Sequence, residues 1–206
     1  MKLHLVRHGE TEWNKLGRFQ GQRDIALNAR GLAQAKETAR AIAEDGEIAL
    51  YSSPLQRTMH VANEISILAD VPVVPVPGVK ELNLGELEGV TGEEMRNLWP
   101  DVYSAWNQDP GTLAMPKGES LSQLQERTWQ SLLELEESHS GDDDVVVLVS
   151  HNFAIRTMIH KILGLPLANF HRLSLSLSSI CTVEYTAMGR RLACYNSTGH
   201  LSPENR

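Results

Sequence analysis

The sequence predicts an α/β sandwich of three layers, in which helices flank both faces of a mostly parallel central sheet. Short apolar runs alternate with amphipathic segments along the chain, an order typical of this class. Residues 145–149 are apolar at every position, as in a strand that is covered on both faces. The length of 206 residues suits one domain with a substantial core, so we expect residues 1–206 to form a single domain.

The strands of this sheet are predicted from apolar and β-branched runs that lie between turn residues. Pro72 and Pro75 interrupt the third run, and because proline cannot donate a hydrogen bond to a central ladder, that run suits an edge strand. The predicted strands cover residues 3–6, 48–51, 71–76 and 145–149, followed by a hairpin of residues 173–185 and 191–196.

Capping residues predict where the helices begin. Asn28 is predicted to cap the first helix, and Ser53 the second, with Pro54 at its first helical position. Ser120 and Gln123 have the spacing of a capping box. A further helix is predicted after the buried strand. These helices alternate with the strands and complete the predicted sandwich.

Residues 78–118 follow neither the helical nor the strand period. The segment contains several glycines together with Trp99, Tyr103 and Trp106. It is predicted to be an inserted loop-and-helix region that forms a lid on the main body. The aromatic side chains also fit a structural role, in which they pack the lid against the body.

Charge and hydropathy exclude several classes of function. The net charge of −7 repels nucleic acid and anionic lipid surfaces, so neither is an expected partner. The longest aliphatic run is far shorter than the roughly 20 residues of a membrane span, and the N-terminus lacks a signal-peptide pattern. Cys181 and Cys194 are expected to be reduced and buried or half-buried. These features favour a cytoplasmic protein.

Arginine and histidine side chains follow three of the predicted strands. Arg7 and His8 end the first strand, Arg57 lies in the first turn after the second, and His151 follows the buried strand. Because the carboxyl ends of parallel strands meet at one edge of a sheet, we expect these four residues to share a pocket. Two fixed cations beside backbone amides predict an anion site, most naturally for a phosphoryl group.

Metal and serine chemistry are not expected. His4 and His8 would lie about 13 Å apart on an extended chain and could not share one ion. No H-E-x-x-H motif or carboxylate cluster with ligand spacing is present. Ser150 lacks a G-x-S-x-G elbow, and Cys181 has no base in its sequence context. We therefore expect no cofactor.

Residues 5–11, with the sequence Leu-Val-Arg-His-Gly-Glu-Thr, resemble the signature of the histidine phosphatase superfamily, in the branch of phosphoglycerate mutases and small-metabolite phosphatases. The likeness covers nearly the entire chain in order and spacing. Its further residues are Trp13-Asn14, Arg18-Phe19-Gln20-Gly21, Asp24, Leu27, Ser52-Ser53-Pro54-Leu55, Arg57-Thr58, Glu81-Leu82, Gly85, Gly118-Glu119-Ser120 and Val149-Ser150-His151. The resemblance implies a phosphoglycerate mutase-like fold.

The resemblance also implies a mechanism without a metal. His8 attacks phosphorus as a neutral imidazole and forms a phosphohistidine that water hydrolyses. Arg7 and Arg57 disfavour the imidazolium form of His8. With His151, they stabilise the charge on the equatorial oxygens.

The leaving alkoxide needs a proton, and Glu81 matches the family's candidate for supplying it. Because the arginines lower the pKa of a nearby carboxyl group, burial under the lid has to raise that of Glu81. Glu86 and Glu88 are expected to be solvated loop carboxylates.

Four further residues are expected to bind the phosphate or the substrate. Asn14 would be a neutral donor, Gln20 and Gly21 loop contacts, and Asn152 either a side-chain donor or the cap of the following helix. Together with the four residues of the anion site, they define the predicted binding pocket.

The resemblance favours hydrolysis of a phosphomonoester over phosphoryl transfer. The mutases carry an adjacent basic pair in the inserted region, and residues 96–117 contain none. A cofactor-dependent phosphoglycerate mutase and a non-catalytic phosphate-binding protein are the alternatives. Leu84 stands where phosphoserine phosphatases tend to have histidine. Phosphoserine, sugar phosphates, phosphoglycerate derivatives and ribazole phosphate all remain open as substrates.

The edge strand at residues 71–76 could pair across a two-fold axis to form a homodimer.

Overall fold

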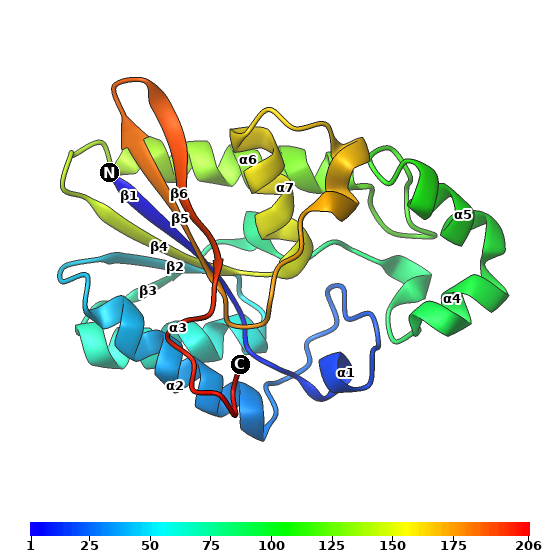
Figure 1. The fold of residues 1–206 in the computed structure, drawn as a ribbon, viewed down its shortest axis with the longest axis horizontal. Coiled ribbons are helices and arrows are strands. Elements are labelled where there is room, and N and C mark those ends of the chain that lie inside the picture. Colours follow the sequence, from blue (N-terminus) through cyan, green and yellow to red (C-terminus); the bar gives the residue numbers. More distant parts are fainter.

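The computed structural model describes residues 1–206 as a six-stranded sheet with helices on both faces (Figure 1). The strand order is β3-β2-β4-β1-β5-β6. The strands are β1 (Lys2–Arg7), β2 (Ala49–Ser52), β3 (Val73–Pro75), β4 (Val145–Ser150), β5 (Ile180–Thr186) and β6 (Gly189–Ser197). β3, β2, β4 and β1 are parallel, whereas β5 and β6 are antiparallel additions. The prediction of a mostly parallel α/β sandwich is confirmed.

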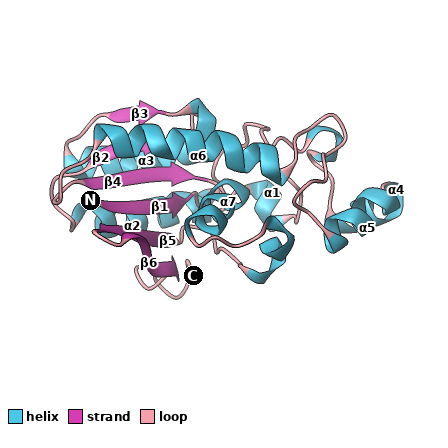
Figure 2. Cartoon of the chain, turned by 90° about the horizontal axis from the view of Figure 1, so that it is seen from above, coloured by secondary structure: helices cyan, strands magenta, loops and turns pink.

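The helices form two layers around this sheet (Figure 2). α2 and α3 pack on one face, where Ala39 and Ile65 meet Val147. α6 and α7 pack on the other, where Leu132 and Ile155 meet Leu148. The helices are α1 (Glu12–Lys15), α2 (Ala29–Ala43), α3 (Gln56–Ala69), α4 (Gly92–Leu98), α5 (Pro100–Gln108), α6 (Leu121–Ser138) and α7 (Asn152–Ile162), with short 3-10 turns η1 (Pro77–Val79), η2 (Gly85–Leu87) and η3 (Leu167–Arg172).

Segment 78–118 extends beyond the carboxyl end of the sheet, at the right of Figure 1. α4 and α5 occupy its centre and do not belong to either helical layer. Buried side chains of this segment form a separate core with α6, α7 and η3. The members of this core include Leu84, Met95, Met115, Leu124 and Phe170.

Two predicted caps proved correct and one proved wrong. The side chain of Asn28 caps α2, and Ser120 with Gln123 forms the capping box of α6. Ser53 does not cap α3, which begins at Gln56. The Ser53 hydroxyl lies 2.7 Å from a ring nitrogen of His151. It therefore bonds to the residue that follows β4 rather than to an amide at the start of α3.

The final hairpin is shorter than predicted, because residues 173–179 are a loop rather than a strand. This loop crosses the end of β1: the amide of Arg7 donates to the carbonyl of Ser179, and that of Ser178 to the carbonyl of His8. Cys181 is buried as predicted, but Cys194 is exposed, because it lies on the edge strand β6. Both thiols are free.

The third strand lies at the edge of the sheet, as its prolines predict. A homodimer through this edge stays a prediction. None of the helices combines the length and the apolar character that crossing a membrane requires.

Candidate active site

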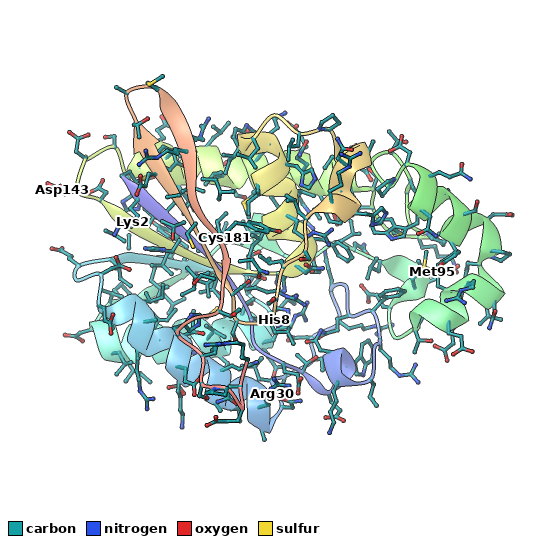
Figure 3. All side chains as sticks on the ribbon, in the orientation of Figure 1. Lys2, His8, Arg30, Met95, Asp143 and Cys181 are labelled. Carbon is teal, nitrogen blue, oxygen red and sulfur yellow. The ribbon has the colours of Figure 1, made fainter.

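Three strand ends bring the predicted anion-binding residues together. Arg7 ends β1 and His8 follows it, Arg57 lies in the first turn of α3, and His151 is the N-cap of α7. The ring centroids of His8 and His151 are 5.3 Å apart. Figure 3 shows His8 at the carboxyl end of β1, below the middle of the molecule. The chain folds these residues into one site because their strands are parallel neighbours.

These residues surround a cavity of about 170 Å³, which we call the phosphate cavity. All the predicted site residues line it except His151, which is fully buried behind the wall. Four lining residues were not among the predicted site residues: Arg18, Phe19 and Leu84, which the sequence analysis named without a binding role, and Phe153. The full lining is Arg7, His8, Asn14, Arg18, Phe19, Gln20, Gly21, Arg57, Glu81, Leu84, Asn152 and Phe153.

A single hydrogen bond fixes the tautomer of His8. Its Nδ1 lies 2.7 Å from the carbonyl oxygen of Gly9. Because a carbonyl only accepts, Nδ1 carries the proton and Nε2 keeps its lone pair. Gly9 is required here, since a Cβ atom would lie 2.8 Å from the carbonyl oxygen of Gly31 on α2. The histidine therefore presents a nucleophilic nitrogen.

The surroundings of His8 keep the ring neutral. Burial lowers its pKa well below the ordinary value, and the charges of Arg57 and Arg7 lower it further. The carbonyl of Gly9 opposes this shift but does not reverse it. The expectation that the two arginines disfavour the imidazolium form is thus supported, with burial as the larger cause.

Arg57 is held by all three of its guanidinium nitrogens. Nε donates to Nδ1 of His151 (3.2 Å), and the terminal nitrogens donate to the carbonyls of Arg23 (2.7 Å) and Gly21 (2.8 Å). Arg7 donates to the carbonyl of Leu175. Burial lowers the pKa of each arginine to about 10, so both remain cations at neutral pH.

His151 is engaged at both ring nitrogens. Because Nδ1 accepts from Arg57, the proton lies on Nε2, which is 2.7 Å from the hydroxyl of Ser53. Burial, Arg57 and His8 hold the pKa of His151 well below its usual value. The structure therefore brings a neutral His151 beside His8 but not to the wall of the phosphate cavity.

Glu81 caps the N-terminus of α7 from outside the helix. Its Oε1 accepts from the amides of Leu82 (2.9 Å), Phe153 (3.1 Å) and Ala154 (3.2 Å). Burial raises the pKa of Glu81, and these amides with Arg57 and Arg7 oppose the rise only in part. The raised pKa agrees with the expectation for a general acid.

Asn152 does not cap α7, so one of its two predicted roles is wrong. Asn152 is the first residue of α7 rather than its cap, and the N-cap residue His151 makes no side-chain capping bond. The carboxylate of Glu81 satisfies the free amides of the first turn instead. The side chain of Asn152 lines the phosphate cavity.

Asn14 lies in the short helix α1, and Gln20 and Gly21 lie in the loop that follows it. Oδ1 of Asn14 accepts from Thr11 (3.1 Å from its amide nitrogen), which leaves Nδ2 as the donor for a ligand. Gly21 has φ +54°, and a Cβ atom there would lie 2.4 Å from Oε1 of Glu88. The loop requires glycine at this position.

Glu88 is not the solvated carboxylate that the sequence analysis predicts. Its side chain is 10% exposed. It accepts from the amide of Gln22 (2.7 Å) and pairs with Arg23 (3.2 Å). It holds the loop that carries Gly21. Glu86 is exposed, as predicted, and pairs with Lys117.

An ion pair between Arg127 and Glu119, which the sequence analysis did not identify, holds the backbone at Glu81. Arg127 of α6 donates to the carbonyls of Gly78 (2.8 Å), Lys80 (2.7 Å) and Glu81 (2.8 Å). Its guanidinium also forms two bonds to Glu119, at 2.9 and 3.0 Å. Such forked pairs are rigid, so Arg127 fixes the position from which Glu81 enters the site.

The structure contains no group of three or more histidine, cysteine, aspartate or glutamate side chains placed to hold a metal ion. The chemical groups present are one lone-pair nitrogen, two anchored cations and one carboxyl group with a raised pKa. This set can bind a phosphoryl group, attack it and protonate a leaving group.

Comparison with known proteins agrees with this chemistry. A family model described as histidine phosphatase superfamily (branch 1) matches residues 3–198. The chain is 32% identical over 201 residues to phosphoserine phosphatase 1 of Hydrogenobacter thermophilus, covering 98% of this chain and 94% of that protein. It is 36% identical over 190 residues to the probable phosphoglycerate mutase GpmB of Escherichia fergusonii, covering 90% and 85%. Its fold matches a mycobacterial glucosyl-3-phosphoglycerate phosphatase with a TM-score of 0.88 and 27% identity, over 96% and 99% of the two chains.

Proposed function

The chain belongs to the histidine phosphatase superfamily (branch 1), and from that premise we propose that it hydrolyses a small phosphorylated metabolite through a phosphohistidine at His8. It is a phosphoric monoester hydrolase. The observation that carries the proposed intermediate is the hydrogen bond from Nδ1 of His8 to Gly9, which leaves the lone pair on Nε2. The proposed reaction needs no metal ion, as in the Arabidopsis thaliana relative named metal-independent phosphoserine phosphatase.

The first half of the reaction transfers the phosphoryl group to the protein. Nε2 of His8 forms a bond to phosphorus while the bond from phosphorus to the ester oxygen breaks. Glu81 gives its proton to the departing oxygen, so an alcohol leaves rather than an alkoxide. The carbonyl of Gly9 stabilises the positive charge that develops on the imidazole ring.

The second half releases inorganic phosphate. The carboxylate of Glu81 takes a proton from water, and the water oxygen attacks phosphorus. The bond between phosphorus and Nε2 then breaks, which restores neutral His8 and protonated Glu81. The pKa of Glu81 is raised by burial, so its protonated form is present at a higher pH than in water.

The cations provide preorganised charge for both halves. Arg7 and Arg57 are anchored to backbone carbonyls, so little reorganisation is needed when a phosphoryl group binds. Asn14 donates through Nδ2. His151 lies behind the wall of the phosphate cavity, so its imidazole ring has to rotate away from Ser53 before Nε2–H can donate to a phosphoryl oxygen. Gln20, Gly21 and Asn152 contact the phosphate or the adjacent part of the substrate.

Hydrolysis is favoured over mutase activity because the phosphate cavity lacks a second basic group from segment 78–118. Arg96 lies over the ring of Tyr103, and Lys117 pairs with Glu86. Neither lines the cavity. Phosphoglycerate mutase is the second candidate, because a relative that is 36% identical over 190 residues carries that probable name.

Turnover of p-nitrophenyl phosphate in the presence of EDTA tests the proposal, with His8→Ala as the control. Loss of activity on adding EDTA would overturn the metal-free mechanism. No turnover of any monoester would favour a phosphate-binding protein without catalysis. Interconversion of 2- and 3-phosphoglycerate faster than hydrolysis would favour the mutase.

The same proposal includes a single domain over residues 1–206, in which segment 78–118 acts as a lid, and a cytoplasmic location. A homodimer through the β3 edge is consistent with the edge position of that strand. Sedimentation that shows only monomer at micromolar concentration would contradict the dimer.

A further inference from the structure

A second cavity, of about 40 Å³, adjoins the phosphate cavity, and we call it the apolar cavity. The two cavities share Phe19, Leu84 and Phe153 in their walls. Every residue that lines the apolar cavity is hydrophobic. Its lining is Phe19, Leu84, Leu87, Met95, Trp106, Met115 and Phe153. A substrate whose phosphoryl group lies at His8 therefore has an apolar recess beside it.

The apolar cavity forms where segment 78–118 meets α7. Trp106 of α5 packs edge-on against Phe153 (ring centroids 5.8 Å apart) and Phe170 (6.0 Å). Phe153 and Phe170 are stacked, with centroids 5.5 Å apart. Met95 of α4, labelled in Figure 3, contributes from the far side. Since these rings brace one another, the recess is a preformed feature of the fold.

No charged side chain lines the apolar cavity, and the indole N–H of Trp106 is the one conventional side-chain donor among its lining residues. Arg18, the one charged side chain of the phosphate cavity outside the predicted catalytic set, donates to the carbonyl of Gly89 and lies 3.5 Å from Glu94. An ammonium or carboxylate group inside the apolar cavity would lose its hydration without gaining a charged partner. The wall therefore disfavours an amino acid or a sugar in this position.

We propose that the preferred substrates are phosphate monoesters of small apolar alcohols, whose alkyl group enters the apolar cavity while the phosphoryl group lies at His8. The inference rests on the proposed function and specifies its substrate class. The volume of about 40 Å³ accommodates one or two methylene-sized groups, given that a water molecule occupies about 30 Å³ in the liquid. Longer chains extend into solvent.

The expected effect follows from burial of hydrocarbon. Each buried methylene changes the binding equilibrium by a factor of about four. Two methylenes that enter the apolar cavity therefore raise kcat/KM by a factor of about 15. Further methylenes add nothing, because the cavity is full.

The test is kcat/KM for methyl, ethyl, n-propyl, n-butyl and n-hexyl phosphate, with 2-methoxyethyl phosphate and phosphoserine as polar counterparts. We expect little change from methyl to ethyl, a rise of about 15-fold from ethyl to butyl, whose two added methylenes enter the apolar cavity, and then a plateau. We also expect butyl phosphate to exceed its isostere 2-methoxyethyl phosphate, although methoxyethanol is the better leaving group. A flat series, or phosphoserine at ten times butyl phosphate, would overturn the inference. Hydrolysis with a flat series leaves the proposed function standing, whereas no hydrolysis of any ester removes both.

Two substitutions at Leu84 separate polarity from shape. Leu84→Asn should remove the dependence on chain length, and Leu84→Met should keep it. The readout is the ratio of butyl to ethyl phosphate within each variant, which does not depend on overall activity. Met115→Gln gives a second polar variant, should Leu84→Asn fail to fold, because Met115 lines the apolar cavity alone. An unchanged ratio in a folded polar variant would contradict the proposal.

Discussion

The phosphate cavity and the apolar cavity share three wall residues, yet different forces hold them together. In the phosphate cavity, backbone carbonyls and amides fix His8, Arg57 and Glu81. In the apolar cavity, side chains from residues 19, 84–115 and 153 meet by packing alone. In the proposed mechanism, the phosphate cavity holds the reacting groups and the apolar cavity selects the alcohol. Substitutions in the two cavities should therefore affect different kinetic quantities.

The largest effect is expected from removing the nucleophile of the phosphate cavity. His8→Ala should lower kcat/KM for every ester by a factor on the order of 10⁵, since His8 is the one histidine that lines the phosphate cavity. Steady-state kinetics with p-nitrophenyl phosphate measures this. His60→Ala, at a half-exposed position of α3, is the matched control and should leave the rate unchanged. Substantial activity in His8→Ala would require another nucleophile.

Arg57→Lys keeps the positive charge but removes the planar guanidinium group, which donates to His151, Arg23 and Gly21. The carbonyls of Gly21 and Arg23 are then left without their donor. We expect kcat/KM to fall by a factor of about 10³, alike for polar and apolar esters. Arg40→Lys, exposed on α2, controls for the substitution itself. A loss that depends on the alcohol would contradict the division between the two cavities.

Glu81→Gln should lower activity according to the leaving group. For butyl phosphate we expect a loss of about 10² to 10⁴, because the alkoxide then leaves unprotonated. For p-nitrophenyl phosphate, the rate of phosphoryl transfer to His8 should fall only slightly, because p-nitrophenolate leaves without a proton. Equal losses of phosphoryl transfer, measured in a single turnover, would remove Glu81 from the role of acid.

The pH profile follows from the two shifted pKa values. In the proposed mechanism, activity requires neutral His8 and protonated Glu81. The pKa of His8 is lowered from its ordinary value of 6.5, so the acid limb of kcat/KM lies below pH 6.5. The pKa of Glu81 is raised from its ordinary value of 4.5, so the alkaline limb lies above pH 4.5. Glu81→Gln should abolish the alkaline limb alone. An alkaline limb that persists in Glu81→Gln belongs to another group.

Arg127→Lys should have the smallest effect on the reaction. Arg127 does not line the phosphate cavity and acts by holding the backbone at Glu81. We expect kcat/KM for butyl phosphate to fall about tenfold, because the carboxyl group of Glu81 is then misplaced. The fall should be smaller for p-nitrophenyl phosphate, which does not need the acid. A shift of the alkaline limb should accompany it. An equal loss for both esters, with an unchanged pH profile, would indicate a purely structural role.

The sequence predicts the phosphate cavity better than the apolar cavity for a physical reason. Strands carry a strong hydropathy signal, and parallel strands bring their carboxyl ends to one edge. Arg7, His8, Arg57 and His151 could therefore be grouped from strand positions alone. The family resemblance added Glu81, which lies on a loop, and Asn14, which lies in a helix of four residues, and neither segment has a periodic signal.

The remainder depends on contacts between distant segments. Nothing near Ser53 indicates that its hydroxyl bonds to His151, 98 residues away, rather than capping α3. Nor does a local pattern show that Glu81 caps α7 in place of Asn152. Phe19 and Phe153 have no common sequence signal, although the aromatic residues of segment 78–118 did predict packing against the body, as Trp106 shows.

Trapping the covalent intermediate tests the central claim most directly. The protein is mixed with an ester whose phosphoryl group is radiolabelled and is quenched at alkaline pH, where phosphohistidine survives, and the labelled peptide is sequenced by mass spectrometry. The account predicts that the label is acid-labile, lies on the imidazole of His8 and is absent from His8→Ala. Label on another side chain, or hydrolysis in a single turnover with no labelled protein at any time, would contradict it.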